Sequence, residues 1–179
     1  EVIYKADPFA FHAELRPGKH SKVFDISSIG TSRTIGINEN EPVIIYEMHL
    51  GSFSKANEYS SIAKEAVSHC LSHGFTHIEV LPVYEHPLDE SWGYQGAGYF
   101  AATARYGSPH GLAEFVRICH DANIGVILDW VPGHFVSDDH ALGKFDGTNL
   151  YERSDHLEYT DWGTLNSDFS KGITQSFML

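Results

Sequence analysis

The side chains best suited to chemistry follow a short apolar run near residue 129. Asp129 ends the run 126–128, where an unpaired carboxylate would cost several kcal/mol, so it must be paired, hydrogen-bonded or directed at a ligand. His134 follows five residues later, after Trp130-Val-Pro-Gly133. An acid and an imidazole at this spacing could hold a polar ligand by hydrogen bonds. A capped strand end followed by a surface histidine is the alternative, and the residue types alone leave both open.

A second group of residues suits a carbohydrate. The sequence Trp92-Gly-Tyr-Gln95 places aromatic rings beside hydroxyl and amide groups. Sugars have C–H faces that stack on rings and hydroxyls that need hydrogen-bond partners. A loop folded onto its own aromatic rings fits this composition equally well. Tyr94 and Gln95 are therefore candidate ligand contacts.

Other titratable residues give weaker signals. Glu47 could pair with Asp129 as the two carboxylates of a glycosidase, but we favour a polar network inside the fold for Glu47 and Glu79. His69 and His73 share a helix face at i and i+4, yet the spacing suggests no third metal ligand. We therefore predict no metal and no cofactor.

The composition excludes several kinds of partner. The 179 residues carry 12 Lys+Arg against 24 Asp+Glu, a formal net charge of −12. Such a chain repels phosphate backbones and anionic lipids, so neither nucleic acid nor a membrane is an expected partner. No apolar run approaches the roughly 20 residues of a membrane helix. Cys70 and Cys119 are predicted to be buried thiols, which fits a cytoplasmic location.

Three apolar runs alternate with two helical patterns. Residues 43–50, 75–81 and 125–131 are predicted strands, and the first is expected to be buried on both faces. Residues 59–73 and 109–122 have apolar side chains at helical spacing. This order of very apolar strands and helices predicts an α/β fold with parallel strands.

Two parallel architectures compete, an open doubly wound sheet and a (β/α)8 TIM barrel. The turn Gly51-Ser-Phe-Ser54 has one glycine, which disfavours the phosphate loop of a doubly wound sheet. A complete barrel takes roughly 250 residues, so the stretch from Pro42 to Leu179 provides about three of its eight units. Barrel active sites lie at the carboxyl ends of the strands, where three places qualify: residues 47–51, residues 92–95 and residues 129–134.

The chain divides into two predicted parts. Residues 1–40 contain turn signals and short extended stretches, and residues 27–41 have the composition of a linker. We predict the tail of a β-sandwich module in 1–40 and the first part of a barrel in 41–179. The absence of an initiator Met and a helical pattern over residues 173–178 lead us to expect a fragment of a longer protein.

Several motifs occur in an order and spacing that resemble glycogen branching enzymes of the α-amylase superfamily (glycoside hydrolase family 13). The motifs are Ile45-Tyr-Glu-Met-His-Leu-Gly-Ser-Phe53, Phe75-Thr-His-Ile-Glu-Val-Leu-Pro82, Ser91-Trp-Gly-Tyr-Gln95, Gly125-Val-Ile-Leu-Asp-Trp-Val-Pro-Gly-His-Phe135 and Asp161-Trp-Gly-Thr-Leu165. The resemblance covers essentially the whole chain. It implies a β-sandwich of the carbohydrate-binding type before the barrel.

The resemblance also assigns roles. Asp129 and His134 would hydrogen-bond the sugar at the cleavage site, Tyr94 would stack on it, and Gln95 would lie beside it. The nucleophilic Asp and the general-acid Glu would come from strands beyond Leu179, so residues 1–179 alone are expected to be inactive. The implied partner is an α-glucan such as glycogen or amylose. The implied reaction transfers α-1,4-glucan segments to 6-hydroxyls with retention, forming α-1,6 branches.

Some alternatives remain. Many α-amylases bind calcium through an Asn directly before the histidine of this region; here that residue is Gly133, so no calcium is expected. A non-catalytic glucan-binding protein, an amylase or a debranching enzyme would share most of these motifs. Three strands taken from a barrel have two open edges, which predicts self-association.

Overall fold

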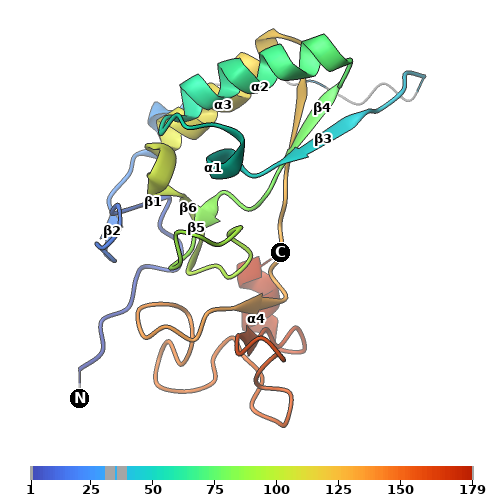
Figure 1. Cartoon of the computed structure of the whole chain (residues 1–179). Coiled ribbons are helices and arrows are strands. Elements are labelled where there is room, and N and C mark those ends of the chain that lie inside the picture. Colours follow the sequence, from blue (N-terminus) through green and yellow to red (C-terminus); the bar gives the residue numbers. More distant parts are fainter. Residues whose placement is uncertain (1, 31–34, 36–39, 179) are drawn as a thin grey trace.

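A parallel sheet covered by two helices forms the centre of the molecule. The computed structural model describes residues 2–30, 35 and 40–178. Strands β3 (Ile45–Met48), β4 (His77–Val80) and β7 (Gly125–Leu128) pair in the order β3-β4-β7. Helices α2 (Tyr59–His73) and α3 (Pro109–Asp121) lie side by side over one face of this sheet (Figure 1). The predicted alternation of parallel strands and helices is confirmed.

The register of the sheet decides which side chains face the helices. Met48 pairs with Val80, and Val80 pairs with Leu128. Because side chains alternate along a strand, these three residues share the helix-covered face and their neighbours share the other. The uncovered face therefore carries Glu47 and Glu79, which are paired with each other in register.

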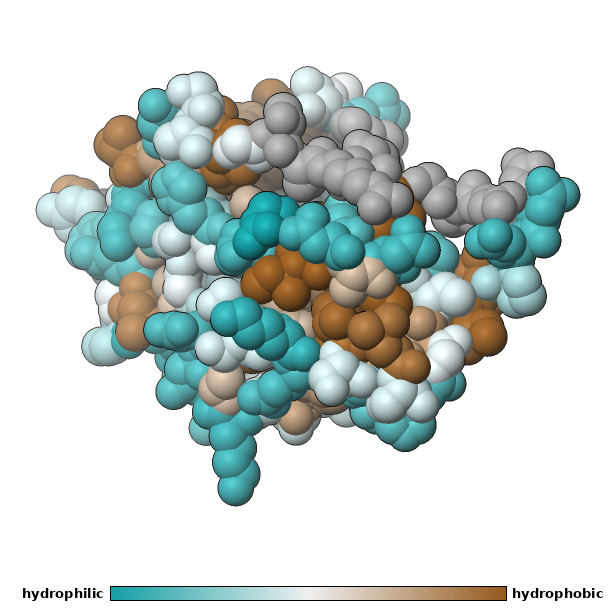
Figure 2. Space-filling model, turned by 90° about the horizontal axis from the view of Figure 1, so that it is seen from above, coloured by the Kyte–Doolittle hydropathy of each residue, from teal (hydrophilic) through white to brown (hydrophobic). Residues whose placement is uncertain are grey.

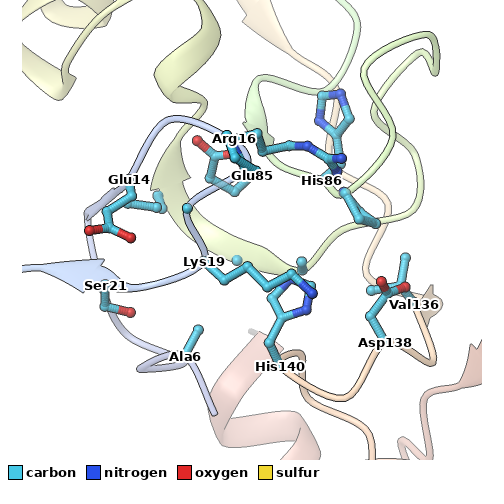
Figure 3. Close-up of a pocket in the computed structure, with 18 of the residues that line it drawn as sticks. Ala6, Glu14, Arg16, Lys19, Ser21, Glu85, His86, Val136, Asp138 and His140 are labelled. Atoms are coloured by element: carbon cyan, nitrogen blue, oxygen red, sulfur yellow. The ribbon is translucent and has the colours of Figure 1, made fainter. Parts of the chain in front are cut away.

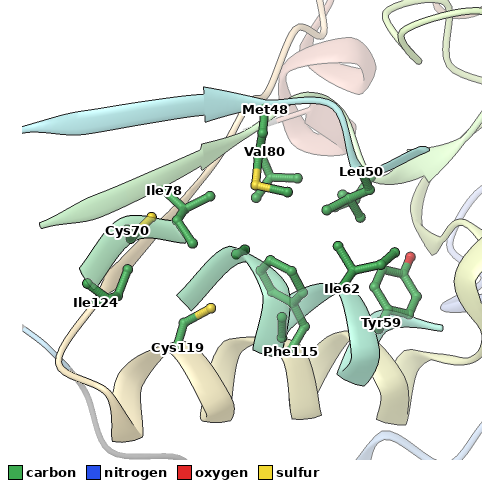
Figure 4. Close-up of a cluster of buried hydrophobic side chains, with 13 residues drawn as sticks. Met48, Leu50, Tyr59, Ile62, Cys70, Ile78, Val80, Phe115, Cys119 and Ile124 are labelled. Carbon is green, nitrogen blue, oxygen red and sulfur yellow. The ribbon is translucent and has the colours of Figure 1, made fainter. Parts of the chain in front are cut away.

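The main hydrophobic core lies between the sheet and the two helices. In Figure 4 the side chains of the strands point toward those of the helices, and each of the ten labelled side chains is at most 4% exposed. The residues drawn with labels are Met48, Leu50, Tyr59, Ile62, Cys70, Ile78, Val80, Phe115, Cys119 and Ile124. Each large side chain buried in this way contributes roughly 1.5–3 kcal/mol. Both cysteines are free thiols in this core, as predicted, and burial raises the pKa of Cys119 to about 12.

The helix boundaries follow from local sequence signals. Gly74 ends α2 in the left-handed conformation at φ 78°, and its N–H donates to the Cys70 carbonyl. Pro109 occupies the first turn of α3, where its missing N–H costs nothing. The predicted ranges of both helices are met to within one residue.

Two strand predictions need correction. The strand predicted over 43–50 spans only 45–48, and residues 50–53 form the short helix α1 (Leu50–Phe53) instead. Its expected burial on both faces is wrong, since Ile44 and Ile45 are 46% and 42% exposed. Helices cover one face, and the described residues put no layer on the other. The strand predicted over 125–131 ends at Leu128.

A second cluster of aromatic side chains lies below the carboxyl end of the sheet. It is built from two small antiparallel pairs, β5 (Tyr84–Glu85) with β6 (Gly98–Ala102) and β8 (His134–Phe135) with β9 (Leu165–Asn166). The short helices η2 (Ala104–Tyr106) and α4 (Gly172–Met178) complete this half. The stretches between the predicted strands and helices thus contain further paired strands. Helix α4 confirms the helical pattern at the end of the chain.

The N-terminal segment packs against this second cluster. It contains β1 (His12–Ala13), β2 (Ser21–Lys22) and η1 (Ile26–Ser28). Phe9 stacks on Phe100 with ring centroids 6.0 Å apart, and the Ala102 N–H donates to the Phe11 carbonyl at 3.3 Å. Positions 31–34 and 36–39 of the predicted linker lie outside the described residues. The division at residue 40 stays a prediction.

The molecular surface is mixed in character. Seen from above, it is mostly hydrophilic, with hydrophobic patches between polar side chains (Figure 2). Throughout the part of the chain that the structure describes, no helix combines the length and hydropathy that crossing a membrane requires.

Candidate functional site

Tyr94 and Asp129 meet at the carboxyl end of the sheet. Asp129 follows β7 directly, and its N–H donates to the Val80 carbonyl at 3.0 Å, which continues the ladder by one residue. The Tyr94 hydroxyl donates to Asp129 Oδ2 at 2.7 Å, across 35 positions of sequence. This hydrogen bond is the main reason that the pKa of Tyr94 rises to about 12, so the phenol keeps its proton at neutral pH. The carboxylate is thus hydrogen-bonded, which satisfies the requirement inferred from its apolar neighbours.

Two further carboxylates make this region acidic. Glu47 and Glu79 lie on the uncovered face of the sheet, and their charges add to the rise in the Tyr94 pKa. Within the described ranges neither accepts a hydrogen bond, so the polar network favoured for them is not formed there. An acidic surface with free acceptor oxygens attracts hydroxyl donors and repels anions.

Gly93 sets the position of Tyr94. Its φ of +92° is rare for other residues, and a Cβ at this position would lie 2.6 Å from the Pro82 carbonyl oxygen. The loop can therefore pass close to the end of β4 only with glycine here. The Gly93 N–H donates to Ser91 Oγ at 3.1 Å, which fixes the turn before Tyr94. Sequence reasoning noted this glycine only as part of a motif.

His134 is held by its backbone, and its side chain is partly buried. It lies in β8 opposite Asn166, and its carbonyl accepts a hydrogen bond from the Tyr99 hydroxyl at 2.5 Å. Burial lowers the pKa of His134, so the imidazole is neutral at pH 7. Its Nδ1 atom is buried, and the described residues give it no hydrogen-bond partner. A neutral imidazole has one donor and one acceptor nitrogen and can bind a hydroxyl in either role.

Tyr84 is a part of this region that sequence reasoning missed. Its ring packs on the ring of Tyr99, with the two centroids 4.9 Å apart. Its hydroxyl is buried without a hydrogen-bond partner in the described chain. Burial raises its pKa, and the nearby Asp129 and Tyr94 add to this rise. Tyr84 is therefore part of the aromatic cluster and also lies near Tyr94 and Asp129. Its sequence context after Pro82 gave no sign of this position.

Gln95 lines a separate cavity of about 430 Å³ between the N-terminal segment and the β5–β6 hairpin. Tyr94, Asp129 and His134 are not among its lining residues. Figure 3 shows Lys19 and His140 near its centre, with Glu85 at one end. The charged side chains around it are Asp7, Glu14, Glu85, Asp138, Arg16 and Lys19. The structure thus joins two of the four predicted contacts, Tyr94 and Asp129, by a hydrogen bond, and roles for His134 and Gln95 in binding sugar stay predictions.

This arrangement can hold a polar, uncharged ligand by several hydrogen bonds. Asp129 offers acceptor oxygens, Tyr94 a ring and a hydroxyl, and His134 a neutral imidazole. Among the residues that the structure describes, no group of three His, Cys, Asp or Glu side chains is placed to hold a metal ion. The geometry therefore points to positioning by hydrogen bonds and stacking.

Comparison with known proteins gives a consistent result. Residues 69–172 match the family model described as "Alpha amylase, catalytic domain". The 1,4-α-glucan branching enzyme of Geobacillus stearothermophilus is 46% identical over 193 aligned positions, which cover 99% of this chain and 30% of that protein. The branching enzyme of Bacillus subtilis is 44% identical, and the alignment covers 100% of this chain and 31% of that protein. The chain thus spans about 30% of the length of these curated relatives.

Solved structures support the fold. A structure from Salmonella typhimurium matches with a TM-score of 0.81 at 23% identity, over 97% of this chain and 29% of that one. Pullulanase from Bacillus acidopullulyticus matches with a TM-score of 0.75 at 22% identity, over 97% of this chain and 26% of that one. At such identities the likeness concerns the fold alone, which is α/β of the TIM-barrel type.

Proposed function

The chain belongs to the α-amylase family, and we propose that it is the glucose-positioning part of a 1,4-α-glucan branching enzyme. The observation that carries this proposal is the hydrogen bond between Tyr94 and Asp129 at the carboxyl end of the sheet. Active sites of TIM-barrel enzymes lie at this end of the strands. The identity of 44–46% to branching enzymes favours this specificity over an amylase or a debranching enzyme.

Each side chain has a proposed role toward one glucose ring. Asp129 accepts hydrogen bonds from sugar hydroxyls with the oxygen that Tyr94 leaves free. The neutral imidazole of His134 binds a further hydroxyl. The Tyr94 ring, fixed by its bond to Asp129, stacks on the apolar face of the sugar. Gln95, the next residue, is proposed to contact a neighbouring part of the substrate.

In the whole protein, cleavage would follow the retaining mechanism of this enzyme class. A carboxylate attacks the anomeric carbon while a second carboxyl group protonates the leaving oxygen. A 6-hydroxyl of another glucan chain then replaces the enzyme carboxylate and forms the α-1,6 branch. We place both reacting carboxyl groups outside residues 1–179. The residues described here act by orienting the sugar, which lowers the entropic part of the barrier.

The proposal also covers the division of the chain. Residues 41–179 would form about three β/α units of the barrel, and residues 1–40 the end of a β-sandwich module with its linker. The parallel order of β3, β4 and β7 supports the first part. The antiparallel pair β1–β2 is compatible with the second.

Binding of malto-oligosaccharide to the 179-residue chain tests the proposal. Isothermal titration calorimetry with maltoheptaose should show binding, and Asp129→Asn should weaken it by roughly tenfold or more, because a hydrogen bond to a charged group is lost. Tyr94→Phe keeps the ring and should have a smaller effect. Glu65→Gln on the exposed side of α2 makes the same kind of change away from the site and should bind normally. Equal affinity of Asp129→Asn and the unsubstituted chain would contradict the proposal.

A further inference from the structure

An exposed tryptophan beside His134 extends the site beyond one sugar ring. We infer that Trp162 is a stacking platform for a second glucose unit of an α-1,4-glucan, next to the unit held by Tyr94, Asp129 and His134. This inference rests on the proposed function and deepens it. The proposed binding of the first glucose by the other side chains does not involve this tryptophan.

The Trp162 side chain is presented to solvent. It is 76% exposed, and in the described chain its one aromatic neighbour is His134, with ring centroids 6.2 Å apart. A single exposed apolar side chain is common on protein surfaces and by itself indicates little. What distinguishes Trp162 is the way in which its backbone is held and the residue that its ring lies beside.

A tight turn over residues 160–164 fixes the backbone of Trp162. The Thr160 N–H donates to the Thr164 carbonyl at 2.8 Å, and the hydroxyls of these two threonines lie 2.6 Å apart. The Trp162 N–H donates to Thr160 Oγ1 at 3.2 Å. Gly163 has a φ of +76°, which glycine adopts without strain. The tryptophan is therefore carried at the tip of a hydrogen-bonded turn, so less conformational entropy is lost when a ligand stacks on it.

The same turn is joined directly to His134. Strand β9 follows the turn at Leu165, and its residue Asn166 pairs with His134 in β8. The Ser167 N–H then donates to the Gly133 carbonyl at 3.0 Å. The imidazole therefore lies on β8, and the indole lies on the turn that leads directly into its partner strand β9.

The two rings offer complementary contacts to a glucan. The neutral imidazole of His134 can bind a hydroxyl of one glucose, and the indole can stack on the C–H face of the next. Asp161 precedes Trp162 in the chain and is also exposed, so its carboxylate can accept a hydrogen bond from a hydroxyl. The acidic surroundings repel anionic ligands, which leaves an uncharged polyhydroxyl chain as the ligand class.

Calorimetric titration of the 179-residue chain with maltoheptaose tests this inference. Trp162→Ala should raise the Kd about tenfold, the size expected for one lost aromatic contact, while Trp162→Tyr keeps a ring and should stay within about threefold. Asp161→Asn changes the same turn without removing the ring and should have a smaller effect than Trp162→Ala. Circular dichroism spectra and melting temperatures verify that each variant is folded. Unchanged affinity of a folded Trp162→Ala variant would overturn the inference while leaving the proposed function intact.

A measurement on the unsubstituted chain does not depend on the folding of any variant. The protein contains three tryptophans, so a ¹⁵N–¹H spectrum resolves three indole N–H signals. Added maltoheptaose should shift the Trp162 signal, assigned by its loss in Trp162→Tyr. Binding that leaves this signal in place overturns the inference alone. An unsubstituted chain that binds no maltoheptaose overturns the proposed function together with it.

Discussion

At the scale of single residues, a few buried nitrogen and oxygen atoms decide what the site can do. The two ring nitrogens of His86, a buried residue next to Tyr84, are an example. Its Nδ1 lies 3.0 Å from the Tyr84 carbonyl, which can only accept, so Nδ1 carries the proton. Its Nε2 is buried with no hydrogen-bond partner in the described part of the chain. Burial is the main cause that lowers the pKa of His86 to about 4.

This depressed pKa predicts a loss of stability in mild acid. In the unfolded chain a histidine takes up a proton near pH 6.5, whereas folded His86 does so only near pH 4. Between these values the unfolded state binds more protons, so the free energy of unfolding falls as the pH falls, by up to about 1.4 kcal/mol per pH unit from this group. Denaturant unfolding at a series of pH values from 7 to 4 should show a shallower fall for His86→Gln.

The matched control for this prediction is His156→Gln. His156 is an exposed histidine in the loop after β8, so His156→Gln makes the same chemical change at the surface. Carboxyl groups also titrate toward pH 4, but they contribute equally to all three proteins. Parallel profiles for His86→Gln and the unsubstituted chain would refute the assignment.

At the scale of elements, the loops after the strands matter more than the strands themselves. The loop after β4 reaches Asp129 because Gly93 passes within contact distance of the Pro82 carbonyl. The turn over residues 160–164 brings Trp162 to His134. Helices α2 and α3 contribute by keeping the ends of β3, β4 and β7 in register.

Substitution of Gly93 should therefore disturb both stability and binding. Gly93→Ala forces a Cβ into the Pro82 carbonyl at a φ of +92°, which should cost about 1–3 kcal/mol of unfolding free energy. Displacement of the neighbouring Tyr94 should weaken maltoheptaose binding as well. Gly172→Ala is the control, since a Cβ there has open space around it. The expectation fails if both alanine variants melt at the same temperature as the unsubstituted chain.

At the scale of the whole molecule, the open sheet is the dominant feature. The described residues leave the outer edges of β3 and β7 without strand partners, and Ile45 and Leu128 are 42% and 47% exposed. Exposed apolar edge strands pair readily with other chains. The 179-residue chain should therefore self-associate at high concentration, as the sequence also led us to expect.

Light scattering over a range of protein concentrations measures this association. Ile45→Lys adds a charge to the edge strand β3 and should shift the protein toward monomer. Leu71→Lys on α2, at a residue that is 61% exposed, adds the same charge away from the sheet and should not. A monomeric unsubstituted chain at the highest concentration would show that the edges are covered in another way.

The sequence by itself determined the elements whose signals are local. Apolar spacing fixed α2 and α3 to within a residue, because helix formation depends on side chains three and four positions apart. The apolar runs gave the three parallel strands, and the motifs gave the family. Asp129 could be singled out because a carboxylate after an apolar run needs a partner.

Only the tertiary structure decided which partner that is. Tyr94 reaches Asp129 across 35 residues, and Trp162 reaches His134 through the pairing of β8 with β9. The exposure of β3 likewise depends on which layers cover the sheet, and its apolar sequence gave no sign of it. Contacts of this kind are set by the packing of segments distant in the chain, and no local pattern of residue types encodes that packing.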